Sequence, residues 1–206
     1  MRAKRIRALA LAAGLVGWYG LVNPRLSRRV QPLVNAALGA GLVAATRAPL
    51  GLRPPAIWSG LRHGLAVAGP IAIAVAASTA IAPVRDGLAG RDLPASSYGW
   101  LGFKIPIGTV WSEEAVFRAA LGTLSADAFG PVWGRVLQSL AFGLSHIDDA
   151  RSTGVPVAGT VVVTGFAGWC FAWLHERSGS LAASMLAHLA TNESGAVAAI
   201  AVQRRT

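Results

Sequence analysis

Hydrophobic and polar positions are arranged along this chain in long blocks, not in the short periods of a soluble protein. About seven apolar segments follow one another, at residues 8–22, 33–45, 64–84, 105–124, 130–147, 155–174 and 180–202. At 1.5 Å per residue, a helix over 64–84 or 155–174 is long enough to cross a hydrocarbon core of about 30 Å. Segment 33–45 is too short to cross upright, so we expect it to be re-entrant, interfacial or extended into its flanks. The pattern predicts an all-α fold, a polytopic bundle of transmembrane helices.

Composition supports this prediction. The chain is 53% hydrophobic and only 14% charged, whereas a soluble domain carries about a quarter charged residues. We therefore expect a multi-pass integral membrane protein of the cell membrane, with residues 1–206 forming one membrane domain. Within it, residues 1–104 would supply N-terminal hydrophobic helices, and 105–202 a core that carries the chemistry. The basic N-terminus could be a secretory signal, but no small-x-small cleavage site follows it, which favours a retained first segment.

The net charge of +10 does not indicate nucleic acid. Arginines stand at the ends of apolar runs, where they suit lipid headgroups better than a nucleic-acid backbone. Membrane lipid is the expected partner, and nucleic acid is not. The single cysteine, Cys170, cannot form a disulfide within the chain, and it is expected to pack as a small apolar residue.

Three apolar segments carry polar side chains that are costly in a bilayer, by about 2.5–3.5 kcal/mol for an ionisable group, and that therefore indicate function. They are Glu113, Glu114 and Arg118 in 105–124, His146 in 130–147, one turn after Phe142, and His188 with Asn192 one turn later in 180–202. If the first two segments are antiparallel neighbours, Glu113 and His146 lie towards the same side of the membrane. The pair in the last segment lies at a reachable depth, so the three helices can share one pocket.

The residue types suggest what such a pocket could do. A carboxylate in a low-dielectric pocket suits a general base, and a histidine beside it can share the same water. A second histidine and an amide offer donors for an oxyanion. Arg118 stands four residues after Glu114, so these two can pair along the helix and leave Glu113 free. Structural roles stay open for each residue, because membrane histidines often only pack and Glu–Arg pairs often snorkel.

Other polar residues carry less information. His63 and His175 are read as interfacial, Asp148 and Asp149 as loop residues, and Glu193 is given no role.

The order of these motifs resembles a known family. "EEAVFR" at 113–118 fits EExxxR, "FGLSH" at 142–146 fits FxxxH, and "HLATN" at 188–192 fits HxxxN. Together they resemble the CPBP intramembrane proteases, also called the Abi or type II CAAX-protease family, over about residues 112–195. The resemblance implies that Glu113 activates water shared with His146, and that Glu114 assists while paired with Arg118. It also implies that His188 and Asn192 stabilise the oxyanion and that Phe142 is a packing residue.

The expected function is therefore intramembrane hydrolysis of a peptide or membrane-protein substrate, with no cofactor and no metal. Zinc held by the two histidines and Glu113 is the alternative. Two other functions stay open: a proton-coupled transporter using Glu113, Glu114 and His146 as a relay, and a non-catalytic bacteriocin-immunity protein.

Overall fold

The computed structural model describes residues 1–205, of which helices make up most. The chain is 83% helical and has no strand in the described residues, so the all-α prediction is confirmed. The elements are α1 (Arg2–Gly17), η1 (Trp18–Val22), η2 (Asn23–Arg25), α2 (Gln31–Thr46), α3 (Ala56–Ser78), α4 (Ala82–Ala89), α5 (Ser97–Gly99), η3 (Trp100–Trp111), η4 (Glu114–Leu121), α6 (Gly122–Phe129), α7 (Pro131–Ser145), α8 (Ile147–Thr153), α9 (Val157–Ser178) and α10 (Leu181–Gln203).

Three helical stretches are long and apolar enough to cross a membrane by length and composition, namely Arg2–Arg25, Ala56–Ser78 and Val157–Ser178. The protein is an integral membrane protein, although a count of seven spanning segments is not confirmed. The other long helices carry the polar residues of the candidate site.

The predicted limits of the third segment, 64–84, are wrong at both ends. Helix α3 begins at Ala56, directly after Pro55, and ends at Ser78. Proline suits a helix start because its fixed φ is helical and its missing N–H is not needed there. Residues 79–81 form a turn, and 82–84 open the separate short helix α4.

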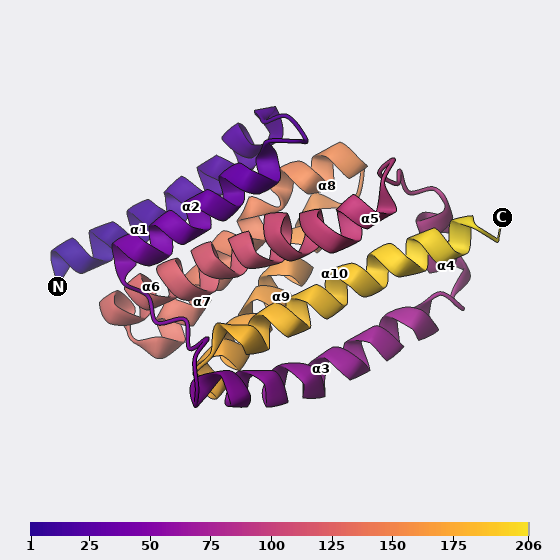
Figure 1. Cartoon of the computed structure of the whole chain (residues 1–206). Coiled ribbons are helices and arrows are strands. Elements are labelled where there is room, and N and C mark those ends of the chain that lie inside the picture. Colours follow the sequence, from indigo (N-terminus) through magenta and orange to yellow (C-terminus); the bar gives the residue numbers. More distant parts are fainter. Residues whose placement is uncertain (206) are drawn as a thin grey trace.

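The fourth segment is part of a longer helical rod. Helix α5, the π-helical stretches η3 and η4, and helix α6 follow one another from Ser97 to Phe129. Short π-helical insertions widen a helix and are frequent at functional sites. In Figure 1 this rod passes through the middle of the bundle, between the α1–α2 pair and α10. All eight residues of η4 are buried, so this rod is the centre of the fold.

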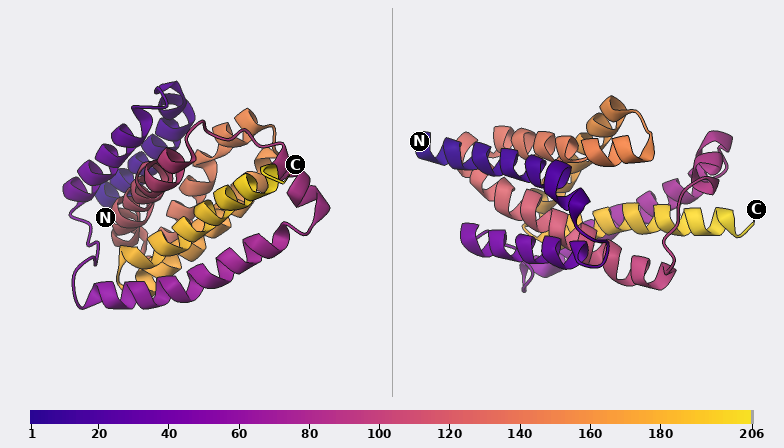
Figure 2. Two further views of the ribbon diagram at one scale, coloured as in Figure 1. Left: turned by 45° about the vertical axis from the view of Figure 1, so that its right-hand side comes forward. Right: turned by 90° about the horizontal axis from the view of Figure 1, so that it is seen from above.

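Small residues let the surrounding helices approach closely. A side chain at Gly64 of α3 would put its Cβ 2.8 Å from Leu186 Cδ1 of α10. At Gly143 of α7 a Cβ would lie 2.5 Å from a backbone carbonyl oxygen of α9. Glycine at such contacts is typical of membrane helices, where close van der Waals packing replaces the hydrophobic effect. Figure 2 shows the two chain ends at opposite ends of the bundle, and α3 lying along α10.

Candidate active site

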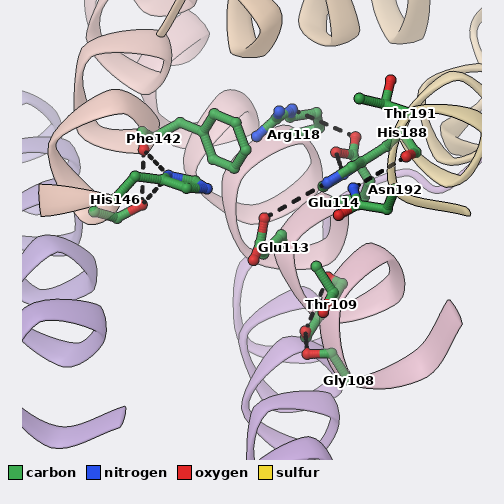
Figure 3. A network of polar contacts seen from close by, with 12 residues as sticks. Gly108, Thr109, Glu113, Glu114, Arg118, Phe142, His146, His188, Thr191 and Asn192 are labelled. Atoms are coloured by element: carbon green, nitrogen blue, oxygen red, sulfur yellow. Dashed lines mark hydrogen bonds and ion pairs between the residues drawn. The ribbon is translucent and has the colours of Figure 1, made fainter. Parts of the chain in front are cut away.

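The first two site residues lie where one π-helical stretch gives way to the next. Glu113 precedes η4 and Glu114 is its first residue. Adjacent residues point about 100° apart on a helix, so the two carboxylates face different surroundings. Figure 3 shows Glu113 and Glu114 in the middle of a polar network that joins the rod to α10.

The carboxylate of Glu114 is paired with other side chains of the protein. Its Oε2 lies 3.4 Å from Arg118 Nε, and both side chains are 0% exposed. Its Oε1 lies 2.8 Å from His188 Nδ1. An ionised carboxylate only accepts hydrogen bonds, so His188 donates Nδ1–H to it. The predicted pairing of Glu114 with Arg118 is present, and His188 is a second partner that the sequence did not indicate.

Glu113 is held far less tightly. Its Oε2 lies 3.8 Å from His188 Nε2, and this oxygen is buried without a hydrogen-bond partner among residues 1–205. The side chain lines a cavity of about 520 Å³. Of the two glutamates, Glu113 is therefore the one that lines the cavity.

His146 reaches the same cavity from the end of α7. Its Nδ1 lies 2.8 Å from the carbonyl oxygen of Phe142. Because a carbonyl can only accept, Nδ1 carries the hydrogen, and Nε2 of the neutral ring is left as an acceptor. Figure 3 shows the ring pointing towards Glu113.

Phe142 packs against the polar groups, as predicted. Its ring meets that of His146 edge-on, with centroids 4.7 Å apart. On its other side the Arg118 guanidinium lies 4.0 Å from the ring centroid, and Phe171 lies 5.3 Å from the same guanidinium. Two aromatic rings therefore flank the cation that neutralises Glu114.

Asn192 and His188 lie one turn apart on α10, and both line the cavity. Asn192 Nδ2 donates to the backbone carbonyl of His188 at 3.2 Å. An amide nitrogen carries two hydrogens, so one remains for a ligand.

The cavity also has a wall that the sequence did not predict. The first hundred residues contribute Tyr19, Asn23, Gln31, Asn35 and Arg91 to its lining. Trp18 Nε1 donates to Asn35 Oδ1 at 3.0 Å, and Asn35 Nδ2 donates to Asn23 Oδ1 at 2.9 Å. This network ties the end of α1 to α2 beside the cavity.

Asp149 corrects the sequence reading. Asp148 and Asp149 were expected in a loop, but both lie in the short helix α8. Asp149 lines the cavity together with Lys104. Desolvation raises the pKa of the Asp149 carboxyl above its ordinary value, and the nearby His146 opposes that rise.

A second cavity, of about 340 Å³, lies on the far side of Arg118. Arg118, Gln138 and His175 line it, and Arg135 and Glu176 form an ion pair there. The position of His175 at the end of a segment predicts an interfacial residue. In the structure His175 lines this second cavity, which its position in the sequence does not indicate.

A metal site was the alternative to a metal-free carboxylate. Among residues 1–205 there is no group of three or more His, Cys, Asp or Glu side chains placed to hold a metal ion. The Nδ1 atoms of His146 and His188 are both engaged with protein oxygens.

The fold and the site together define a helical membrane protein with a carboxylate, two histidines and an amide around one cavity. Residues 95–193 match the family model of the type II CAAX prenyl endopeptidases described as Rce1-like. That region contains all three motifs. Over this region the chain is similar to the CPBP, or type II CAAX protease, family, and the predicted resemblance is confirmed. Neither a curated protein nor a solved structure showed significant similarity to the chain.

Proposed function

We propose that this protein is an intramembrane endopeptidase in which Glu113 and His146 activate a water molecule. The match to a peptidase family model supports peptide hydrolysis and a peptide substrate. The observation that carries the assignment of the base is the contrast between the two glutamates. Glu114 is held by Arg118 and His188, while Glu113 lines the cavity.

The reaction begins with a water between Glu113 Oε2 and His146 Nε2. Both atoms accept hydrogen bonds, so they hold the two water hydrogens and leave an oxygen lone pair for the substrate carbonyl carbon. As the new C–O bond forms, Glu113 takes one proton and the carbonyl π electrons move to oxygen. The C–N bond then breaks while Glu113 passes its proton to the departing amine. Bonds and protons balance with no other reactant.

The oxyanion is stabilised from α10. Asn192 offers the hydrogen of Nδ2 that the backbone does not use. His188 uses Nδ1–H on Glu114, so a hydrogen bond from His188 to the oxyanion has to come from its other ring nitrogen, Nε2. Donors fixed before reaction stabilise developing charge without reorganisation.

Phe142 and Arg118 act indirectly. The phenyl ring fixes the orientation of His146, and the guanidinium keeps Glu114 ionised beside His188. The proposed reaction uses no cofactor and no metal ion. A proton relay, as a transporter would need, requires Glu114 to exchange protons, whereas its two oxygens are held by Arg118 and His188.

The substrate we propose is a peptide or membrane-protein segment that reaches the cavity from the lipid phase of the cell membrane. Outward-facing apolar side chains on α9, such as Val162, Val163 and Phe166, are 67–69% exposed. They form a surface that suits contact with lipid.

The test compares cells producing wild-type protein with cells producing Glu113→Gln. Terminal proteomics should find at least one peptide terminus that is present with the wild type and missing with Glu113→Gln. The matched control is Asp86→Asn, an exposed carboxylate on α4, which should leave that terminus in place. Identical termini in wild-type and Glu113→Gln cells would remove the basis of the proposal.

A further inference from the structure

Tyr19 lies in the π-helical stretch η1, outside the region that the family model matches. Its side chain is 9% exposed, and its ring lies 5.7 Å from that of Phe117. The neighbouring Trp18 is fixed by its hydrogen bond to Asn35. Tyr19 is therefore held from two sides, by the core of the rod and by the network that joins α1 to α2.

The buried hydroxyl of Tyr19 has no partner in hydrogen-bond geometry among residues 1–205; the nearby Ser112 hydroxyl donates its own hydrogen to the carbonyl oxygen of Gly108 at 2.6 Å. Oε2 of Glu113 likewise lacks a partner in hydrogen-bond geometry among these residues, and both Tyr19 and Glu113 line the same cavity. Buried polar atoms in proteins are nearly always paired, so an unpaired one needs an explanation. Two such atoms around one polar cavity are explained by a ligand that contacts both.

The two atoms differ in what they can offer. An ionised carboxylate only accepts, whereas a phenol can donate its O–H. The donors on α10 are already partly occupied, since His188 Nδ1–H serves Glu114 and one Nδ2 hydrogen of Asn192 serves the backbone. An oxyanion needs several preorganised donors, and the Tyr19 hydroxyl of η1 offers a further one from the lining of the same cavity.

We propose that Tyr19 is a catalytic residue that donates a hydrogen bond from its hydroxyl to the oxyanion formed when the Glu113-activated water attacks the substrate carbonyl. This inference rests on the proposed peptidase function. It assigns to the N-terminal helices a direct part in the reaction, in addition to their part in the fold. No proton is transferred from Tyr19, so the balance of the reaction is unchanged.

The test removes one oxygen atom. Tyr19→Phe keeps the ring that packs on Phe117 and deletes only the hydroxyl. The chain has two tyrosines, and the other, Tyr98, is 93% exposed, so Tyr98→Phe is a matched control. The substrate is a reporter peptide containing the bond identified by terminal proteomics. We expect kcat of Tyr19→Phe to fall by about 10²–10³-fold with KM little changed, as for loss of one oxyanion donor. Tyr98→Phe should match the wild type.

A second measurement separates oxyanion binding from an effect on Glu113. A peptide aldehyde of the same sequence adds water to form a tetrahedral analogue of the intermediate. Its affinity should fall in Tyr19→Phe by the same factor as kcat/KM, while the affinity for the uncleaved peptide stays at the wild-type value. Unchanged aldehyde affinity, or a loss that appears only as a displaced acidic limb of the pH–rate profile, would overturn the proposal.

Thermal unfolding in detergent, expected to match the wild type, excludes a folding defect in Tyr19→Phe. If Glu113→Gln is inactive and Tyr19→Phe is fully active, the inference about Tyr19 fails and the peptidase proposal stands. If Glu113→Gln retains wild-type activity, the proposed function itself fails.

Discussion

Replacing Arg118 by methionine tests how the buried glutamate is held in place. Methionine keeps a long unbranched side chain and suits a helix, but it removes the positive charge. Glu114 would then be buried with His188 as its remaining partner. The structure therefore predicts a large loss of stability from a change that keeps much of the side-chain volume.

The magnitude follows from burial. Removing one partner of a buried ion pair costs about 3–5 kcal/mol, because the other charge is left without compensation. For soluble chains of this length, each kcal/mol changes Tm by about 2–4 °C, so Tm should fall by about 6–20 °C. The assay is tryptophan fluorescence of the purified protein in detergent, recorded during heating.

An exposed ion pair in the same chain provides the control. Lys4 Nζ lies 2.8 Å from Asp127 Oδ1, closer than Arg118 is to Glu114, but these side chains are 56% and 54% exposed. Exposed pairs contribute about 0–1 kcal/mol, so Lys4→Met should change Tm by no more than about 4 °C.

The double variant Glu114→Gln/Arg118→Met leaves neither charge unpaired, and it should recover much of the lost Tm. Equal shifts in Tm for Arg118→Met and Lys4→Met would refute the reasoning, because burial of the ion pair would then make no difference to the cost of removing its cation. A double variant less stable than Arg118→Met would show that the charges are not coupled.

Three further predictions concern packing, capping and metal. Gly143→Ala should lower Tm, because its Cβ would lie 2.5 Å from a backbone oxygen of α9, whereas Gly41→Ala, with nothing within 4 Å, should leave Tm unchanged or higher. Ser180→Ala should cost about 0.5–2 kcal/mol in a denaturant titration, because the hydroxyl caps α10 and also donates to Gly51 O at 2.7 Å. Cleavage of the reporter peptide should continue in the presence of EDTA or 1,10-phenanthroline; inhibition that added zinc reverses would contradict the metal-free proposal.

What the sequence could predict was mostly local. The limits of α7 and α10 lie within a few residues of the predicted segments, because long apolar blocks and the Gly–Pro pair at 130–131 mark helix ends directly. The pairing of Glu114 with Arg118 was also predictable, since residues four apart share a helix face.

The residues that were missed depend on which helices are neighbours. Tyr19 follows a tryptophan near the end of an apolar segment, where aromatic residues usually mark the membrane interface. Only its packing against Phe117 of η4 places it in the cavity. His188 likewise contacts both glutamates because α10 lies against the rod, and no spacing along the chain could have indicated that contact.

The start of α3 was missed for a different reason. Arg62 and His63 interrupt the hydrophobic pattern, so this pattern predicts that the apolar segment begins after them, at residue 64. In the structure both are inside the helix, where His63 Nδ1 contacts the carbonyl oxygen of Ser59 at 2.8 Å. Pro55 was the better signal for the helix start.

The aromatic surroundings of Arg118 favour arginine at the last position of EExxxR, since its guanidinium lies 4.0 Å from the ring centroid of Phe142 and 5.3 Å from that of Phe171. A guanidinium is flat and weakly hydrated, so it can lie against aromatic rings while it also faces a carboxylate. Lysine would carry the same charge as a compact, strongly hydrated ammonium group, which suits such a place less well. The motif therefore encodes a shape as well as a charge.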